Sequence, residues 1–91
     1  MRVKHRQFKR DRNEAEIVAA LEKIGCRVSC IASEDGFPDL VCSLGGKLAL
    51  LEIKQNQSSP LTPAQVEWHR EWQRHSHIVW TAEQALEIMT K

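Results

Sequence analysis

Three charged residues at the ends of two short apolar segments have the types and spacing to hold a divalent cation. Asp39 begins one segment, and Glu52 and Lys54 end the next. Carboxylate oxygens are the ligands that Mg²⁺ and Mn²⁺ prefer in proteins. A bound cation of this kind polarises a phosphoryl oxygen and lowers the pKa of its water, and a nearby lysine stabilises developing negative charge. The chemistry suited to this set is hydrolysis of a phosphate ester.

A hairpin centred on Gly45-Gly46 would bring the three side chains together. Gly-Gly between two apolar runs is a strong hairpin signal. Because 45 and 46 add to 91, cross-strand partners also add to 91, which makes Asp39 and Glu52 direct partners. Opposed Cβ atoms lie about 4.5–5.5 Å apart. Lys54 is two residues beyond Glu52 and therefore points to the same face.

A further carboxylate, Glu14, lies on the apolar side of a helix predicted over residues 12–24. The apolar stripe of this helix consists of Ile17, Val18, Leu21 and Ile24. These positions recur at helical spacing, and Glu14 stands at the N-terminal end of the stripe. We therefore expect Glu14 to point toward the sheet.

The alternative to a metal site is a structural ion pair, in which Lys54 neutralises Asp39 or Glu52. Isolated carboxylate–lysine pairs are usually structural. Here the acids outnumber the base, and Glu14 lies on the buried stripe. Two close carboxylates repel each other, and their burial is costly without a cation. These points favour the metal site.

The remaining pattern predicts an α/β domain. Strands are expected at 26–32, 39–44, 47–54 and 77–80, a polar loop at 55–60, and helices from 62 to 74 or 75 and over 81–89. Thr62 with Gln65 and Thr81 with Gln84 have the capping-box spacing of helix starts. Both faces of the hairpin are apolar, so we expect the order α-β-β-β-α-β(-α), with a central mixed sheet flanked by helices.

The charge is unevenly distributed along the chain. Residues 1–12 carry six cations against Asp11, about +5, so the rest of a chain of net charge +1 carries about −4. The six cations are Arg2, Lys4, Arg6, Lys9, Arg10 and Arg12. A basic arm of this kind binds nucleic acid or is simply solvated. We treat residues 1–12 as an arm with candidate nucleic-acid-binding residues and 13–91 as the domain.

Composition places the chain among ordinary single-domain proteins. Its length of 91 residues is enough for one modest core. No apolar run approaches the roughly 18 residues that span a bilayer, and no signal peptide is expected. Three unclustered cysteines argue against a disulfide framework, so we expect a reduced, cytoplasmic protein with no membrane partner.

Three segments occur in a fixed order along the chain. They are Gly36-Phe37-Pro38-Asp39-Leu40, Leu51-Glu52-Ile53-Lys54 and Leu61-Thr62-Pro63-Ala64-Gln65. Together they resemble the VRR-NUC branch of the PD-(D/E)XK nuclease superfamily, over about residues 14–80. The resemblance implies a restriction-endonuclease-like core. It also implies a metal-dependent endonuclease that hydrolyses DNA.

The resemblance assigns a role to each matching position. The implied metal ligands are the carboxylates Glu14, Asp39 and Glu52 and the backbone carbonyl of Ile53. Asp39 and Glu52 with Lys54, the implied catalytic lysine, and Gln65 would form the catalytic set. Gln65 has a plain alternative as the capping residue of its helix.

The resemblance also implies a substrate and an assembly. Small members of this branch resemble Holliday-junction resolvases, which suggests branched DNA as the substrate and a homodimer as the active form. The rival interpretation is a nucleic-acid-binding module that keeps the nuclease fold without cutting.

Several other side chains have two interpretations. Trp68 and Trp72, four residues apart, can stack on bases but are more often core or dimer interface. The histidines His69, His75 and His77 lack cysteine partners at zinc-finger spacing, which disfavours a zinc site. Arg70 and Arg74 contact either a phosphate backbone or neighbouring glutamates.

Overall fold

The described part of the chain contains seven helices and strands, which follow one another in the predicted order. The computed structural model describes residues 11–31 and 38–91. Within them the elements are α2 (Asp11–Lys23), β1 (Arg27–Cys30), β2 (Leu40–Leu44), β3 (Lys47–Ile53), α3 (Pro63–Glu71), β4 (Ser76–Val79) and α4 (Ala82–Thr90). The basic residues of 1–10 and the motif residues Gly36-Phe37 lie outside the described ranges. Arg12 belongs to α2, so the helix begins inside the predicted arm.

The described strands form one mixed sheet in the order β1-β2-β3-β4. The first three are antiparallel neighbours, whereas β4 runs parallel to β3. From Leu40↔Leu51 to Leu44↔Lys47 the paired numbers add to 91, as predicted. Gly45 and Gly46 have φ of 56° and 90°, which a two-residue hairpin turn requires and glycine adopts without strain.

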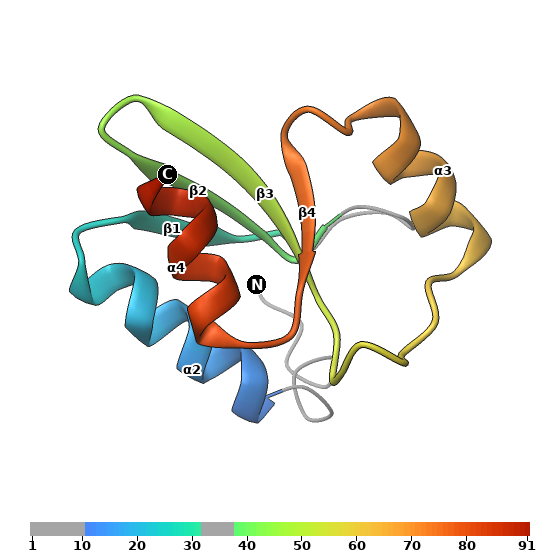
Figure 1. The fold of residues 1–91 in the computed structure, drawn as a ribbon, viewed down its shortest axis with the longest axis horizontal. Helices are drawn as coiled ribbons and strands as arrows, with labels where there is room; N and C mark the ends of the chain where they lie inside the picture. Colours follow the sequence, from blue (N-terminus) through green and yellow to red (C-terminus); the bar gives the residue numbers. More distant parts are fainter. Residues whose placement is uncertain (1–10, 32–37) are drawn as a thin grey trace.

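The core lies between one face of the sheet and the pair α2 and α4. Figure 1 shows these two helices side by side on the same side of the sheet. From the helices come Ile17, Leu21, Ala85 and Met89, and from the sheet Leu40, Cys42, Ala49, Leu51, Ile53 and Val79. Within β2 and β3 the apolar core positions alternate, as a period of two predicts, and Glu52 on the other face of β3 is buried as well.

The opposite face of the sheet is less covered than its apolar residues suggest. Leu48 on β3 is 49% exposed and Ile78 on β4 is also exposed. The helix α3 contributes no buried residue over its described length, and Figure 1 shows it apart from the other helices, beyond β4. It ends at Glu71, three or four residues earlier than predicted.

Candidate functional site

Two charged side chains at alternate positions, Glu52 and Lys54, lie near the end of β3 and directly after it. Glu52 is 1% exposed, and its Oε2 lies 3.8 Å from Nζ of Lys54. The Lys54 side chain retains 13% exposure. The core side chains Leu51 and Ile53 flank Glu52 in sequence and point the other way. The strand thus directs apolar groups into the core and the carboxylate to its opposite face.

Gln65 joins both charged groups to the start of helix α3. Its Nε2 donates to Oε2 of Glu52 at 2.9 Å, and its Oε1 accepts from Nζ of Lys54 at 3.0 Å. The same Oε1 accepts from the backbone N–H of Thr62 at 2.9 Å, which closes the capping box. All three partners agree on one orientation of the amide, since an oxygen must face two donors. The capping and site interpretations of Gln65 are therefore compatible in one conformation.

Asp39 lies at the point where β2 and β3 leave their regular ladder. Strand β2 begins at Leu40, one residue later than predicted. The backbone N–H of Asp39 donates to the carbonyl of Leu51, and its Oδ2 accepts from the N–H of Ile53 at 2.8 Å. The ladder therefore stops before the predicted Asp39–Glu52 pair. The Asp39 carboxylate lies instead against the peptide bond that joins Glu52 to Ile53, and it is 3% exposed.

Glu14 is buried on α2, as the apolar stripe predicted. Its Oε2 accepts a hydrogen bond from Sγ of Cys30, at 3.5 Å, on the first strand. Among residues 11–31 and 38–91, no three carboxylate, imidazole or thiol groups gather as a ready-made metal site. The structure thus joins Glu52, Lys54 and Gln65 and places Glu14 against the first strand.

Asn13 is a positioning residue that the sequence analysis did not identify. Its Nδ2 donates to the backbone carbonyl of Lys54 at 3.1 Å and to that of Trp80 at 3.4 Å. One amide group supplies two donors, so a single side chain ties the ends of β3 and β4 to helix α2. Asparagine in a first helical turn is ordinary, so no signal in the sequence distinguished it.

His69 lies on the same helix as Gln65 and faces the sheet. Its Nδ1 is 2.9 Å from Oγ of Ser76, at the start of β4. Burial lowers the pKa of His69, and the nearby Lys54 and His77 lower it further. Burial, followed by Lys47 and His75, likewise lowers the pKa of His77. Both imidazoles are therefore held toward the neutral form.

These two histidines should make the fold less stable in mild acid. An unfolded histidine has a pKa of about 6.5. Below that pH the unfolded chain binds more protons than the folded one, so the free energy of unfolding decreases as the pH is lowered. Well above that pH the two histidines do not affect stability. Urea unfolding at pH 7.5 and 5.5 measures this loss. The His69→Gln variant should lose less stability between the two pH values than the unaltered protein, and an equal loss would contradict this assignment.

Other predicted contacts are resolved more simply. Arg70 pairs with Glu67 at 2.8 Å, and both are largely exposed, so this is a surface pair. The rings of Trp68 and Trp72 stack on each other, with centroids 5.1 Å apart. Trp72 is 48% exposed and is not a core residue.

No helix in the described ranges is both long and apolar enough to cross a bilayer.

The donor set near the end of β3 fits a hard divalent cation. Two buried carboxylates, Asp39 and Glu52, flank one peptide bond, and one lysine accompanies them. Mg²⁺ usually takes one or two carboxylates and keeps several waters. A third protein carboxylate is therefore unnecessary for such an ion, and the oxygen-only set excludes the softer metals that prefer thiolate.

The structure is an α/β domain with a mixed four-stranded sheet and buried acids at the end of a central strand. Comparison with solved structures finds the same architecture in a structure described as "VRR_NUC domain". The similarity has a TM-score of 0.75 and covers 88% of this chain and 92% of that chain. No family model matches the sequence, and no curated protein matches it. At 22% identity the likeness confirms the predicted VRR-NUC resemblance and the predicted fold class at the level of the fold.

Proposed function

We propose that this chain is a divalent-metal-dependent endonuclease that hydrolyses phosphodiester bonds in DNA. The observation that supports it best is the buried Glu52, linked to Lys54 and Gln65 within hydrogen-bonding or ion-pairing distance. The Asp39 carboxylate accepts a hydrogen bond from the backbone N–H of Ile53, the residue that follows Glu52. The group lies at the end of β3, which has β2 on one side and β4 on the other, and the fold is similar to that of the structure described as "VRR_NUC domain".

Burial of these acids is costly, and a functional role would explain why the protein keeps them. Removing a carboxylate from water without full compensation costs several kcal/mol. Lys54 lies 3.8 Å from Glu52, and its Nζ donates to Gln65. Asp39 lies against the peptide bond that joins Glu52 to Ile53. Two buried carboxylates at one strand end suit a hard divalent cation, which usually takes one or two such ligands.

Each residue of this group has a proposed role. Asp39 and Glu52 would hold Mg²⁺ or Mn²⁺, with the carbonyl of Ile53 and Glu14 as further ligands. When bound, the ion would supply charge stabilisation at the phosphoryl group and an acidified water. Lys54 would hold the attacking water or stabilise negative charge on the phosphate oxygens. Gln65 would position Lys54 and Glu52, because its amide contacts both.

The substrate in this proposal is branched DNA, such as a four-way junction, cut by a homodimer. The resemblance in sequence to resolvase-like VRR-NUC members supports this choice, together with the similar fold. Two copies related by a two-fold axis present two sites to a symmetric junction. The cations of residues 1–12 would add sequence-independent affinity for phosphates that weakens with salt.

Asp39→Asn is the sharpest test of the proposal. Asparagine keeps an oxygen to accept the Ile53 N–H, so the fold is preserved while the charge is lost. With labelled four-way junction and Mg²⁺ or Mn²⁺, the unaltered protein should cut and the variant should not. Junction binding in EDTA should be equal for the two proteins. Equal cutting by both would refute the assignment of Asp39 to the active site, and binding without cutting by either would replace the nuclease with the non-catalytic binding module.

A further inference from the structure

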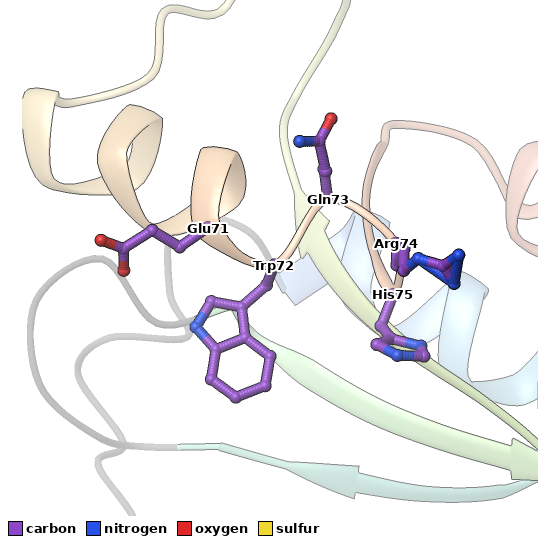
Figure 2. A pocket seen from close by; sticks show the side chains of 5 residues that line it. All are labelled: Glu71, Trp72, Gln73, Arg74 and His75. Carbon is purple, nitrogen blue, oxygen red and sulfur yellow. The ribbon is translucent and has the colours of Figure 1, made fainter.

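An open hollow of about 500 Å³ lies at the end of helix α3. It is lined by Glu71, Trp72, Gln73, Arg74 and His75. In Figure 2 the indole of Trp72 and the imidazole of His75 extend to the same side of the chain, and Arg74 lies next to His75. The hollow thus combines an aromatic ring, a guanidinium and polar side chains.

One face of the Trp72 ring stacks on Trp68, whose ring is inclined by only 12° at a centroid distance of 5.1 Å. Nearly half of the Trp72 side chain is nevertheless exposed. A second flat aromatic group can therefore continue the stack, and nucleobases are such groups.

The backbone holds Trp72 in place. Its N–H donates to the carbonyl of Trp68, and its own carbonyl accepts from the N–H groups of His75 and Ser76 at 2.9 Å. The carbonyl of His75 in turn accepts from Leu50 on β3 at 2.8 Å. The turn after α3 is therefore fixed to the sheet, and the ring needs little reorganisation to bind.

Charge favours a nucleotide over an apolar partner. In the described part of the chain Arg74 makes no ion pair, and its side chain is exposed. A guanidinium suits a phosphate. Glu71 opposes an anion, but a carboxylate accepts hydrogen bonds from the amino groups of bases.

The helix also sets the spacing from the group around Glu52. Gln65 and Trp68 lie on α3 and Trp72 caps its C-terminal end, at positions that recur at helical spacing. Seven residues at a rise of 1.5 Å place Trp72 roughly 10 Å along the axis from Gln65. A stacked strand covers this distance in about three nucleotides at roughly 3.4 Å each.

We propose that the hollow binds one unpaired nucleobase of a DNA strand, with Trp72 as the stacking surface and Arg74 at the adjoining phosphate. The inference rests on the proposed function for the source of the strand, namely the unpaired segment of a branched substrate a few nucleotides from the cut. Binding of the base does not require that the strand be cleaved.

Binding in EDTA separates this proposal from the nuclease. A labelled oligothymidine and a blunt duplex of equal length serve as probes. Trp72→Ala should weaken oligothymidine binding by about 5- to 150-fold, the worth of one stacked base, and leave duplex binding unchanged. Trp72→Phe should retain most of the affinity. The control is Val66→Ala, on the same helix and also 48% exposed, which should change neither.

Arg74→Gln gives a second reading that does not depend on the indole. It should reduce the slope of log affinity against log salt for oligothymidine by about 0.7, the effect of one lost phosphate contact.

Unchanged affinity in Trp72→Ala would overturn the proposal. So would equal loss for both probes, or a shift of that variant from dimer to monomer in sedimentation, which would make the ring a subunit contact. Failure of cleavage alone would overturn only the nuclease.

Discussion

A protein with Glu52→Gln should cut DNA roughly a thousandfold more slowly than the unaltered protein and yet be more stable in metal-free buffer. Loss of a metal ligand removes several kcal/mol of transition-state stabilisation, at about 1.4 kcal/mol per tenfold. The stability gain arises because the glutamine is neutral, keeps an acceptor for Gln65, and removes a buried negative charge. Single-turnover cleavage and urea unfolding in EDTA measure the two effects.

The Gln65→Ala variant is the matched comparison for this prediction. It leaves the charge of Glu52 in place and removes only the amide that contacts it. Its rate should fall by less, and its stability should fall rather than rise, because Glu52 and the cap of α3 both lose a partner. If Glu52→Gln instead lowers stability as well as activity, the carboxylate belongs to a structural ion pair.

Leu51→Ala should destabilise the fold more than any surface change, by about 2–5 kcal/mol. Leu51 is fully buried and lies at the centre of the sheet, between Leu40 on β2 and His77 on β4. A domain of this size has about 5–15 kcal/mol of stability in total. The urea midpoint should therefore drop by a large fraction of its value.

Leu48→Ala makes the same chemical change in the same strand. Leu48 is 49% exposed and pairs with Ser43 on the open face of the sheet. Its replacement should cost less than about 1 kcal/mol. Comparable losses for the two variants would show that the second face of the sheet is buried in solution by something other than α2 and α4.

Local signals in the sequence predicted most of the fold. The Gly45-Gly46 turn determined the register of β2 and β3, and the spacing of Thr62 with Gln65 predicted a helix start that the structure confirms. The end of α3 was predicted too late. It depends on the carbonyl of Trp72 accepting N–H groups from the segment that enters β4, and no local pattern reveals this contact.

The candidate site was predictable to the extent that it lies within one strand. A period of two places Glu52 and Lys54 on one face without any tertiary information. Asp39 was expected to continue the ladder, but its side chain replaces a backbone acceptor for Ile53, which ends the ladder. Asn13 contacts Lys54 and Trp80, which are separated from it by 41 and 67 positions in the sequence. Only the folded chain brings such groups together.

Helix α3 has no buried residue over its described length and is tied to the sheet mainly through the polar side chains of Gln65 and His69. Elements attached in this way open at lower free energy than the core and exchange their amide hydrogens first. Glu52, on β3, and Lys54, directly after this strand, therefore belong to the slowly exchanging unit of the domain, whereas the Gln65 side chain that joins them belongs to the fast one. Glu52 and Lys54 therefore stay in position when α3 opens and Gln65 moves away with it.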